Sequence, residues 1–316
     1  MSWHSSRLSP MFRRVLVIAG VALGLSGCSK NYSAERLYWK AQQIGAPVIK
    51  NPRTATPEQF ALAVNAFQHV VERTPGTMWA ARAQAVIGSF YADQQHYDKA
   101  REAFGLVIQN YNRYSDLALG ARIGIAKSYE REDRWEEAAK AYAEISAYHP
   151  WSTVGLDAPL YIATVYAKRQ QPEQAKKAYE RAARAYTKLI PNAPSPEMAL
   201  QVKGYLALAY HQLGRWDQAV AILEEVKAST SPGVNRPYVL LALGMIYQQR
   251  LGSTDKAAEW YTTLAQEFPE HPFGKLAKTK LTELGRPVPE PKAAQPQAVK
   301  PHGAAPSQPA GVGAGH

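Results

Sequence analysis

The sequence contains very little cysteine, since Cys28 is the only one among 316 residues. An internal disulfide or a thiolate metal site needs at least one more thiol, so both are excluded. Catalytic signatures are also missing: there is no H-E-x-x-H helix, no G-x-S-x-G elbow and no glycine-rich phosphate loop followed by lysine. We therefore expect neither an enzyme nor a protein that requires a cofactor, a metal or a small-molecule substrate.

The chain also lacks an apolar run long enough to cross a bilayer. Residues 15–25 are apolar or glycine, but a membrane-spanning helix needs about 20 such residues. Arg13 and Arg14 precede this run and small residues end it, which is typical of a secretory signal peptide. Translation could start at Met1 or at Met11, because either choice leaves a basic segment before the apolar run.

The end of the apolar run, Leu25-Ser26-Gly27-Cys28, resembles the bacterial lipobox. The resemblance implies cleavage of residues 1–27, lipidation of Cys28 including palmitate, and an acylated linker at residues 28–32. Several acyl chains hold a protein firmly, because each buried methylene contributes about 0.8 kcal/mol. Ser29, in place of aspartate, implies sorting to the periplasmic side of the outer membrane. An ordinary signal peptide with a chance or buried thiol is the alternative.

An excess of acidic charge is lacking as well. Residues 1–27 hold three arginines and no acid, so cleavage lowers the formal net charge from +11 to +8. Basic proteins can bind nucleic acid, but export and the lack of basic blocks interleaved with aromatics argue against it. Anionic lipid headgroups or acidic envelope proteins are the partners that this charge favours.

What the sequence does contain is a repeat. Five segments share one pattern, and they begin at Ile87, Ile125, Ile162, Leu206 and Leu243. The small residue that follows each of these is Gly88, Ala126, Ala163, Ala207 or Gly244, and the tyrosine three positions later is Tyr91, Tyr129, Tyr166, Tyr210 or Tyr247. After a turn come an alanine (Ala100, Ala138, Ala175, Ala219, Ala257) and a bulky residue (Phe104, Tyr142, Tyr179, Leu223, Tyr261). These spacings place one apolar stripe on each of two helices, and such hairpins must stack on their neighbours to bury it.

This pattern resembles the tetratricopeptide repeat, a pair of antiparallel helices in about 34 residues. An earlier second helix has the same spacing in Ala63, Phe67, Val70 and Pro75, and its first helix is expected over residues 33–44. The link over residues 45–57 would then be about ten residues longer than in the repeat family. We predict an all-α tetratricopeptide-repeat solenoid of about six helix-turn-helix repeats over residues 33–285.

The spacing of the repeats predicts where the solenoid changes and where it ends. The second-helix alanines are separated by 37, 38, 37, 44 and 38 residues, and the longest interval contains the proline-rich residues 191–197, where we expect a loop or a bend. Residues 271–284 are predicted to form a C-terminal capping helix with Phe273, Leu276, Ala277 and Leu281 on its apolar side. Residues 286–316 are rich in proline, alanine and glycine, a composition typical of a disordered tail.

The resemblance also implies a partner-binding groove lined by the first helix of each repeat. The positions that match it are Arg82, Ser89, Asp93, Lys127, Glu130, Arg131, Asp157, Tyr161, Thr164, Lys168, Gln201, Tyr205, His211, Met245 and Gln248. Their mixture of polar and aromatic side chains suits an extended peptide or another protein's surface. Each could equally be an ordinary solvent-facing helix residue.

The anchor and repeats together resemble two families of envelope proteins. One is the repeat lipoprotein of the outer-membrane β-barrel assembly machine, and the other is the periplasmic repeat protein that works beside the Tol-Pal system. The resemblance implies a non-enzymatic, lipid-anchored scaffold that serves, in the first place, outer-membrane protein assembly. The alternatives are a Tol-Pal, cell-division or peptidoglycan-associated adaptor, or an accessory lipoprotein of a pilus, secretion or polysaccharide-export system.

Overall fold

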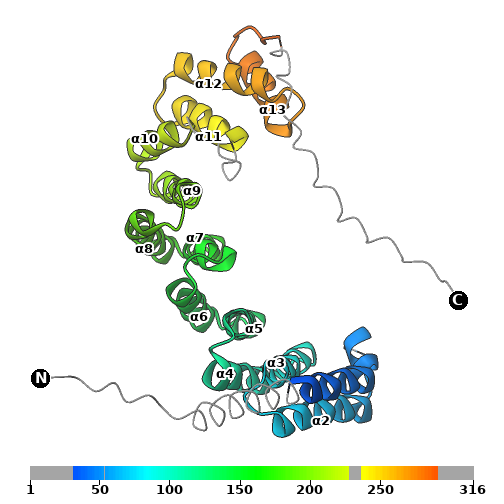
Figure 1. Ribbon diagram of the computed structural model, residues 1–316. Helices are drawn as coiled ribbons and strands as arrows, with labels where there is room; N and C mark the ends of the chain where they lie inside the picture. Colours follow the sequence, from blue (N-terminus) through cyan, green and yellow to red (C-terminus); the bar gives the residue numbers. More distant parts are fainter. Residues whose placement is uncertain (1–30, 53, 228–235, 291–316) are drawn as a thin grey trace, which may run out of the picture. The chain divides into compact units, whose positions relative to one another are not determined.

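The computed structural model describes residues 31–52, 54–227 and 236–290, and the regular elements in these ranges are all helices (Figure 1). The predicted signal peptide, Cys28 and residues 291–316 of the predicted tail lie outside the described residues. None of the described helices is long and apolar enough to cross a membrane. The predicted all-α repeat fold is therefore confirmed for the part of the chain that the structure describes.

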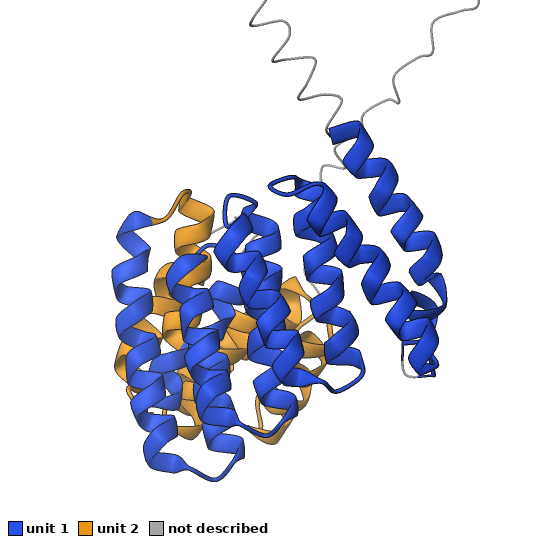
Figure 2. Ribbon diagram, turned by 90° about the horizontal axis from the view of Figure 1, so that it is seen from below, with its two compact units in different colours: residues 1–192, 208–213 blue, residues 193–207, 214–316 orange. Residues whose placement is uncertain are grey.

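The chain divides into two compact units, residues 1–192 with 208–213 and residues 193–207 with 214–316 (Figure 2). After a helical segment over residues 31–50, the first part of the chain forms α2 (Pro57–Arg73), α3 (Met78–Asp93), α4 (Tyr97–Tyr111), α5 (Ser115–Arg131), α6 (Trp135–Tyr148), α7 (Thr153–Lys168), α8 (Pro172–Leu189) and the 3-10 helix η1 (Ile190–Asn192). The rest forms α9 (Pro196–Gln212), α10 (Trp216–Lys227), α11 (Arg236–Gln249), α12 (Thr254–Glu267) and α13 (Pro272–Glu283). Each unit is described by itself.

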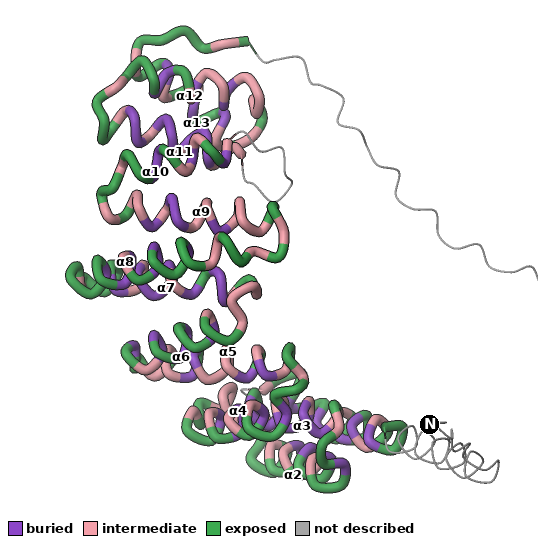
Figure 3. Tube along the Cα trace, turned by 60° about the vertical axis from the view of Figure 1, so that its left-hand side comes forward, coloured by how far each residue is buried: buried purple, intermediate pink, exposed green. Residues whose placement is uncertain are grey.

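Successive helices pack as the repeat pattern predicts. In the first unit α3 packs on α4, α5 on α6 and α7 on α8, and each pair also packs on the next; in the second unit α11 packs on α12. Buried and exposed residues alternate along each helix, so one stripe faces a neighbour and the other faces solvent (Figure 3). The bulky second-helix residues are all buried, from Tyr179 at 7% exposure to Tyr261 at 0%.

Close approach between the two helices of a pair depends on the small first-helix residues. A Cβ atom built on Gly88 would lie 2.7 Å from Phe104 Cδ1, and one built on Gly124 would overlap the same ring. A Cβ atom on Gly244 would overlap the ring of Tyr261 in the same way. Gly88 and Gly244 therefore make room for an aromatic ring of the partner helix, as the sequence pattern predicts, and Gly124, which the pattern does not include, does the same for the ring of the preceding helix.

Five of the hairpin turns share a residue in the left-handed conformation. Gln95, Asp133, Gln170, Gly214 and Gly252 have φ between 59° and 71°, and each lies five residues before the second-helix alanine of its hairpin. This left-handed conformation costs a residue with a side chain roughly 1–2 kcal/mol, and glycine avoids that cost. The left-handed residue keeps this position in all five hairpins although only two of them place glycine there, and the fifth turn accommodates one extra residue between Tyr247 and Gly252.

Two predicted helix details are wrong. The first helix does not end at Ile44 but continues to residue 50, so the link to α2 is short. The reason is that Gly45 and Val48 extend the buried stripe of Tyr38 and Ala41, and a Cβ on Gly45 would lie 3.0 Å from Phe67 Cε2.

The capping helix buries Ala277 and Leu281 as predicted, but the rest of its buried stripe differs from the prediction. In α13 the buried residues are Gly274, Ala277 and Leu281, whereas Leu276 is 39% exposed and Phe273 is half-buried. Positions 274, 277 and 281 recur at the i, i+3, i+7 spacing of one helix face, and Leu276 lies beside that face. The proline-rich segment behaves as expected, because α8 ends at Leu189 and α9 begins only at Pro196.

We predict that Gly244→Ala destabilises the protein by about 1–3 kcal/mol, because the added methyl group overpacks against the fully buried Tyr261 ring. The matched control is Gly204→Ala in α9, where an added Cβ meets nothing within 4 Å. Alanine there should stabilise the helix by about 0.5–1 kcal/mol. Urea unfolding followed by circular dichroism measures both, and equal effects of the two substitutions would contradict the packing argument.

Candidate functional site

Ten of the predicted groove residues lie on α3, α5 and α7 of the first unit. We call the solvent-facing side of these three helices the first-helix surface. Lys127, Arg131, Asp157 and Lys168 are exposed, and no partner of Lys127 or Lys168 is found among the described residues. Their long charged side chains are therefore available to another molecule. This is the part of the predicted site that is free to bind.

Glu130 is fixed between two repeats. It is half-buried on α5, and its Oε2 accepts a hydrogen bond of 2.8 Å from the hydroxyl of Tyr142 on α6. Its Oε1 accepts a second hydrogen bond, from the hydroxyl of Tyr161 on α7. The rings of Tyr142 and Tyr161 meet edge to face, with centroids 5.1 Å apart. The structure thus brings together two predicted site residues, Glu130 and Tyr161, that are 31 positions apart in the sequence.

These contacts keep both phenols protonated. Burial, and secondarily the hydrogen bond to Glu130, raises the pKa of Tyr142, and the same two causes raise the pKa of Tyr161 to about 12. A protonated hydroxyl can donate to a carboxylate, whereas a phenolate would repel it. Glu130 therefore keeps two donors under ordinary conditions and is held in one orientation at the first-helix surface.

Aromatic rings support this cluster from beneath. Trp135, at 4% exposure, packs edge-on against Tyr161 with centroids 6.1 Å apart and against Tyr166 with centroids 5.8 Å apart. The Tyr166 hydroxyl donates to Glu136 Oε2 over 2.8 Å. Such edge-to-face pairs each contribute about 0.5–1.5 kcal/mol beyond the area they bury. The first-helix surface near Tyr161 is consequently a rigid part of the molecule.

In other repeats too, the hydroxyl of a tyrosine on the second helix contacts a predicted groove residue on the first helix. Thr164 Oγ1 and the Tyr179 hydroxyl lie 3.4 Å apart, and in the second unit the Tyr261 hydroxyl donates to Gln248 Oε1 over 2.8 Å. The repeat pattern identifies these tyrosines only as bulky residues. The signal that could have revealed more is the choice of tyrosine over phenylalanine at a position that is otherwise buried.

The other predicted groove residues of α3 and α5 are not part of this tyrosine cluster. Asp93 and Arg131 line one shallow depression of about 200 Å³ together with Tyr97. Arg82 stacks over the ring of Trp79 at 4.8 Å from its centroid, and Ser89 donates its hydroxyl to the carbonyl of Ala85 over 3.2 Å.

The predicted groove residues on α9 and α11, the first helices of the last two repeats, are only partly accessible. Gln201, Tyr205 and Met245 of the second unit are half-buried, on α9 and α11, and so is His211 at the end of α9. The described residues hold no cluster of three or more histidine, cysteine, aspartate or glutamate side chains that could bind a metal.

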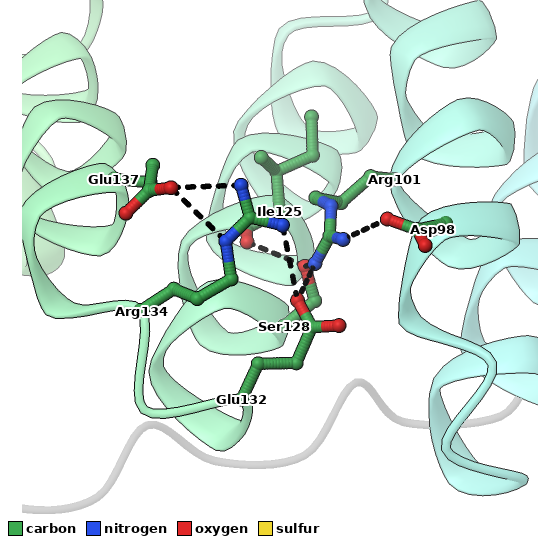
Figure 4. A network of polar contacts seen from close by, with 7 residues as sticks. All are labelled: Asp98, Arg101, Ile125, Ser128, Glu132, Arg134 and Glu137. Atoms are coloured by element: carbon green, nitrogen blue, oxygen red, sulfur yellow. Dashed lines mark hydrogen bonds and ion pairs between the residues drawn. The ribbon is translucent and has the colours of Figure 1, made fainter.

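A charged network that the sequence did not reveal joins α4, α5 and α6 (Figure 4). Arg101 pairs with Asp98 and with Glu132, and its side chain is only 9% exposed. Arg134 pairs with Glu137 over 2.7 Å. The guanidinium groups of Arg101 and Arg134 also lie 4.3 Å and 4.9 Å from the ring centroid of Tyr129. The network therefore fixes the end of α5, next to Glu130 and Arg131.

Comparison with protein-family models matches residues 162–233, and separately residues 238–271, to the tetratricopeptide repeat. These residues are tetratricopeptide repeats, which build scaffolds for protein–protein interaction. A comparison with curated proteins finds no match.

Several solved structures have a similar arrangement of helices. They include PilW, a widely conserved type IV pilus biogenesis factor, with 17% identity, a TM-score of 0.38, and coverage of 76% of this chain and 97% of that chain. YrrB, a tetratricopeptide-repeat protein with an unusual peptide-binding site, has 17% identity, a TM-score of 0.41, and coverage of 68% and 99%. BtubC from P. vanneervenii has 16% identity, a TM-score of 0.39, and coverage of 86% and 97%. At these values the structures carry no information about the partner of this chain.

We predict that the protein loses stability as the pH rises above about 10, and that Tyr161→Phe reduces this loss. The folded protein holds the Tyr161 proton up to a pKa of about 12, whereas an unperturbed tyrosine releases it near 10, so the stabilising effect is complete below pH 10 and disappears toward pH 12. Urea unfolding between pH 8 and 11 measures the slope. Tyr148→Phe is the control, because Tyr148 is 66% exposed. An unchanged slope in Tyr161→Phe would contradict the assigned role.

Proposed function

We propose that this chain is a lipid-anchored scaffold on the periplasmic side of a bacterial outer membrane. The support for the anchor is the sequence Leu25-Ser26-Gly27-Cys28 after a short apolar run. The support for the scaffold is the array of tetratricopeptide repeats in residues 162–233 and 238–271. Acyl chains on Cys28 hold the protein at the membrane, and the helices present a surface to envelope proteins.

The first-helix surface of the first unit is the proposed partner-binding site. The observation that carries this proposal is the fixed Glu130–Tyr142–Tyr161 cluster with exposed Lys127 and Lys168 on the same helices. A surface whose side chains are already ordered loses less conformational entropy when it binds a partner. Exposed lysines around an ordered aromatic cluster suit an extended peptide segment or a protein surface with acidic side chains.

The envelope process that we propose is outer-membrane protein assembly. Its partners would be proteins of the β-barrel assembly machine or extended segments of their substrates. A scaffold role needs no chemistry from the protein itself, in keeping with the repeat fold. The binding energy would come from complementary charge and from burial of Tyr161 and its neighbours.

We predict that Cys28→Ser releases the protein from membranes or leaves it unprocessed, because serine cannot receive a thioether-linked diacylglycerol. Metabolic labelling with palmitate, followed by membrane fractionation, tests this outcome. Ser26→Ala is the control, since it keeps a small residue before the cysteine. Incorporation of palmitate into the Cys28→Ser protein at the level of the unmodified protein would disprove the anchor.

We predict that the double substitution Lys127→Glu with Lys168→Glu abolishes capture of the partner from cross-linked membranes. Both residues are exposed, so charge reversal leaves the core intact but repels an acidic partner. The control is Lys177→Glu, at an exposed position of α8. Recovery of barrel-assembly components with the unmodified and control proteins, and their loss from the double variant, is the expected result. If the unmodified protein captures no barrel-assembly components, the proposed role in outer-membrane protein assembly is contradicted.

A further inference from the structure

A groove of about 810 Å³ lies between α6, α7 and α8 of the first unit. Its floor is formed by one side of α7, with Pro159, Ile162 and Tyr166. With 100° per residue, these positions point roughly 160° away from Asp157, Tyr161, Thr164 and Lys168 of the same helix. The groove is thus on the opposite side of α7 from the first-helix surface and is a separate feature of the molecule.

The walls of this groove are built from small side chains. Ala139, Ala143 and Ala147 line it at four-residue intervals along α6, and Ala178, Ala182 and Ala185 line it along α8. Alanine projects little from a helix, so an incoming molecule can approach both wall helices closely at these positions. The interval from 139 to 147 spans just over two turns, about 12 Å of helix at 1.5 Å per residue. A short amphipathic helix fits a groove of these dimensions.

The rim of the groove is positively charged. Lys140 of α6 and Arg181 and Lys188 of α8 line it and are exposed. Among the described residues no ion pair involves any of these three cations. Of the described residues that line the groove, Glu136 is the only acid, and its Oε2 already accepts the hydrogen bond from Tyr166. An occupant with acidic side chains beside an apolar face would complement both the rim and the floor.

The ends of this chain lack the required charge. Residues 1–30 and 291–316 contain no aspartate and no glutamate, and both segments carry basic residues. Neither segment could therefore neutralise Lys140, Arg181 and Lys188. The occupant that the charges favour is part of a different molecule.

We propose that this groove docks a short, acidic amphipathic helix of a partner protein. Apolar side chains of that helix would contact Ile162 and Pro159, and its carboxylates would face Lys140, Arg181 and Lys188. This is a second docking surface, independent of the first-helix surface, so the scaffold can hold two partners on opposite sides of α7. Burial of apolar area provides the affinity, and the rim charges select acidic over basic helices.

The test uses a fluorescein-labelled 15-residue peptide of alanine, leucine and glutamate. Its leucines recur every third and fourth position, and its glutamates flank that stripe. A second peptide carries lysine in place of every glutamate. Fluorescence anisotropy with the full chain should show at least tenfold tighter binding of the glutamate peptide. Ala143→Phe, which fills the groove, and Arg181→Glu, which reverses a rim charge, should each weaken that binding at least tenfold.

Matched controls make the same changes elsewhere. Arg184→Glu reverses an exposed charge of α8 that does not line the groove, and Ala221→Phe enlarges an exposed alanine of α10. Both should bind the glutamate peptide like the unmodified protein, and circular dichroism checks that all variants are folded.

Each of the following results would overturn the proposal. They are no binding of the glutamate peptide, equal binding of the two peptides, equal binding by Ala143→Phe, and binding of laurate without binding of the peptide, which would assign the groove to a small amphiphile. Sedimentation that shows a dimer lost in Ala143→Phe, without peptide binding, would assign the groove to a second copy.

Discussion

The structure depends on the contact between a small residue of one helix and an aromatic ring of the next. Phe104 lies against Gly88 within its own hairpin and against Gly124 of the following one, so a single ring fixes two interfaces. Tyr261 has the same relation to Gly244 in the second unit. Because packed interiors tolerate neither overlap nor voids, the ring and the gap that receives it set the distance between helices. The positions of surface residues follow from that distance.

Tyrosine adds a polar function to the same packing position. Its ring fills the space between helices, while its hydroxyl reaches the first helix and binds Glu130 or Gln248. Core and surface are thereby linked by one side chain, and a change in the core would also move the residues that face a partner. The Arg101 network also links packed helices to the surface, since it attaches the end of α5 to α4 through Glu132.

The sequence was sufficient for the hairpins and insufficient for the contacts between them. Small and bulky positions recur at fixed intervals, so the helices and their buried faces could be predicted. The extension of the first helix was missed because Gly45 and Pro47 are ordinarily helix-ending residues, and only the buried stripe through Val48 shows that the helix continues. The Glu130–Tyr161 contact spans two repeats, and no local spacing encodes it. The alanine-lined groove was missed because alanine is common in any helix, whether or not a face is covered.

The fixed position of the left-handed turn residue contrasts with the variation of the links between hairpins. In all five hairpins the left-handed residue stands five positions before the second-helix alanine, from Gln95 to Gly252. Removal of one residue between them would rotate the second helix by about 100° and direct its alanine away from the partner helix. The links have no such register to keep, and the distance between successive alanines varies from 37 to 44 residues. An inserted residue is therefore compatible with the fold in the links between hairpins, or ahead of the left-handed residue as in the turn between Tyr247 and Gly252, because neither place changes the register of the second helix.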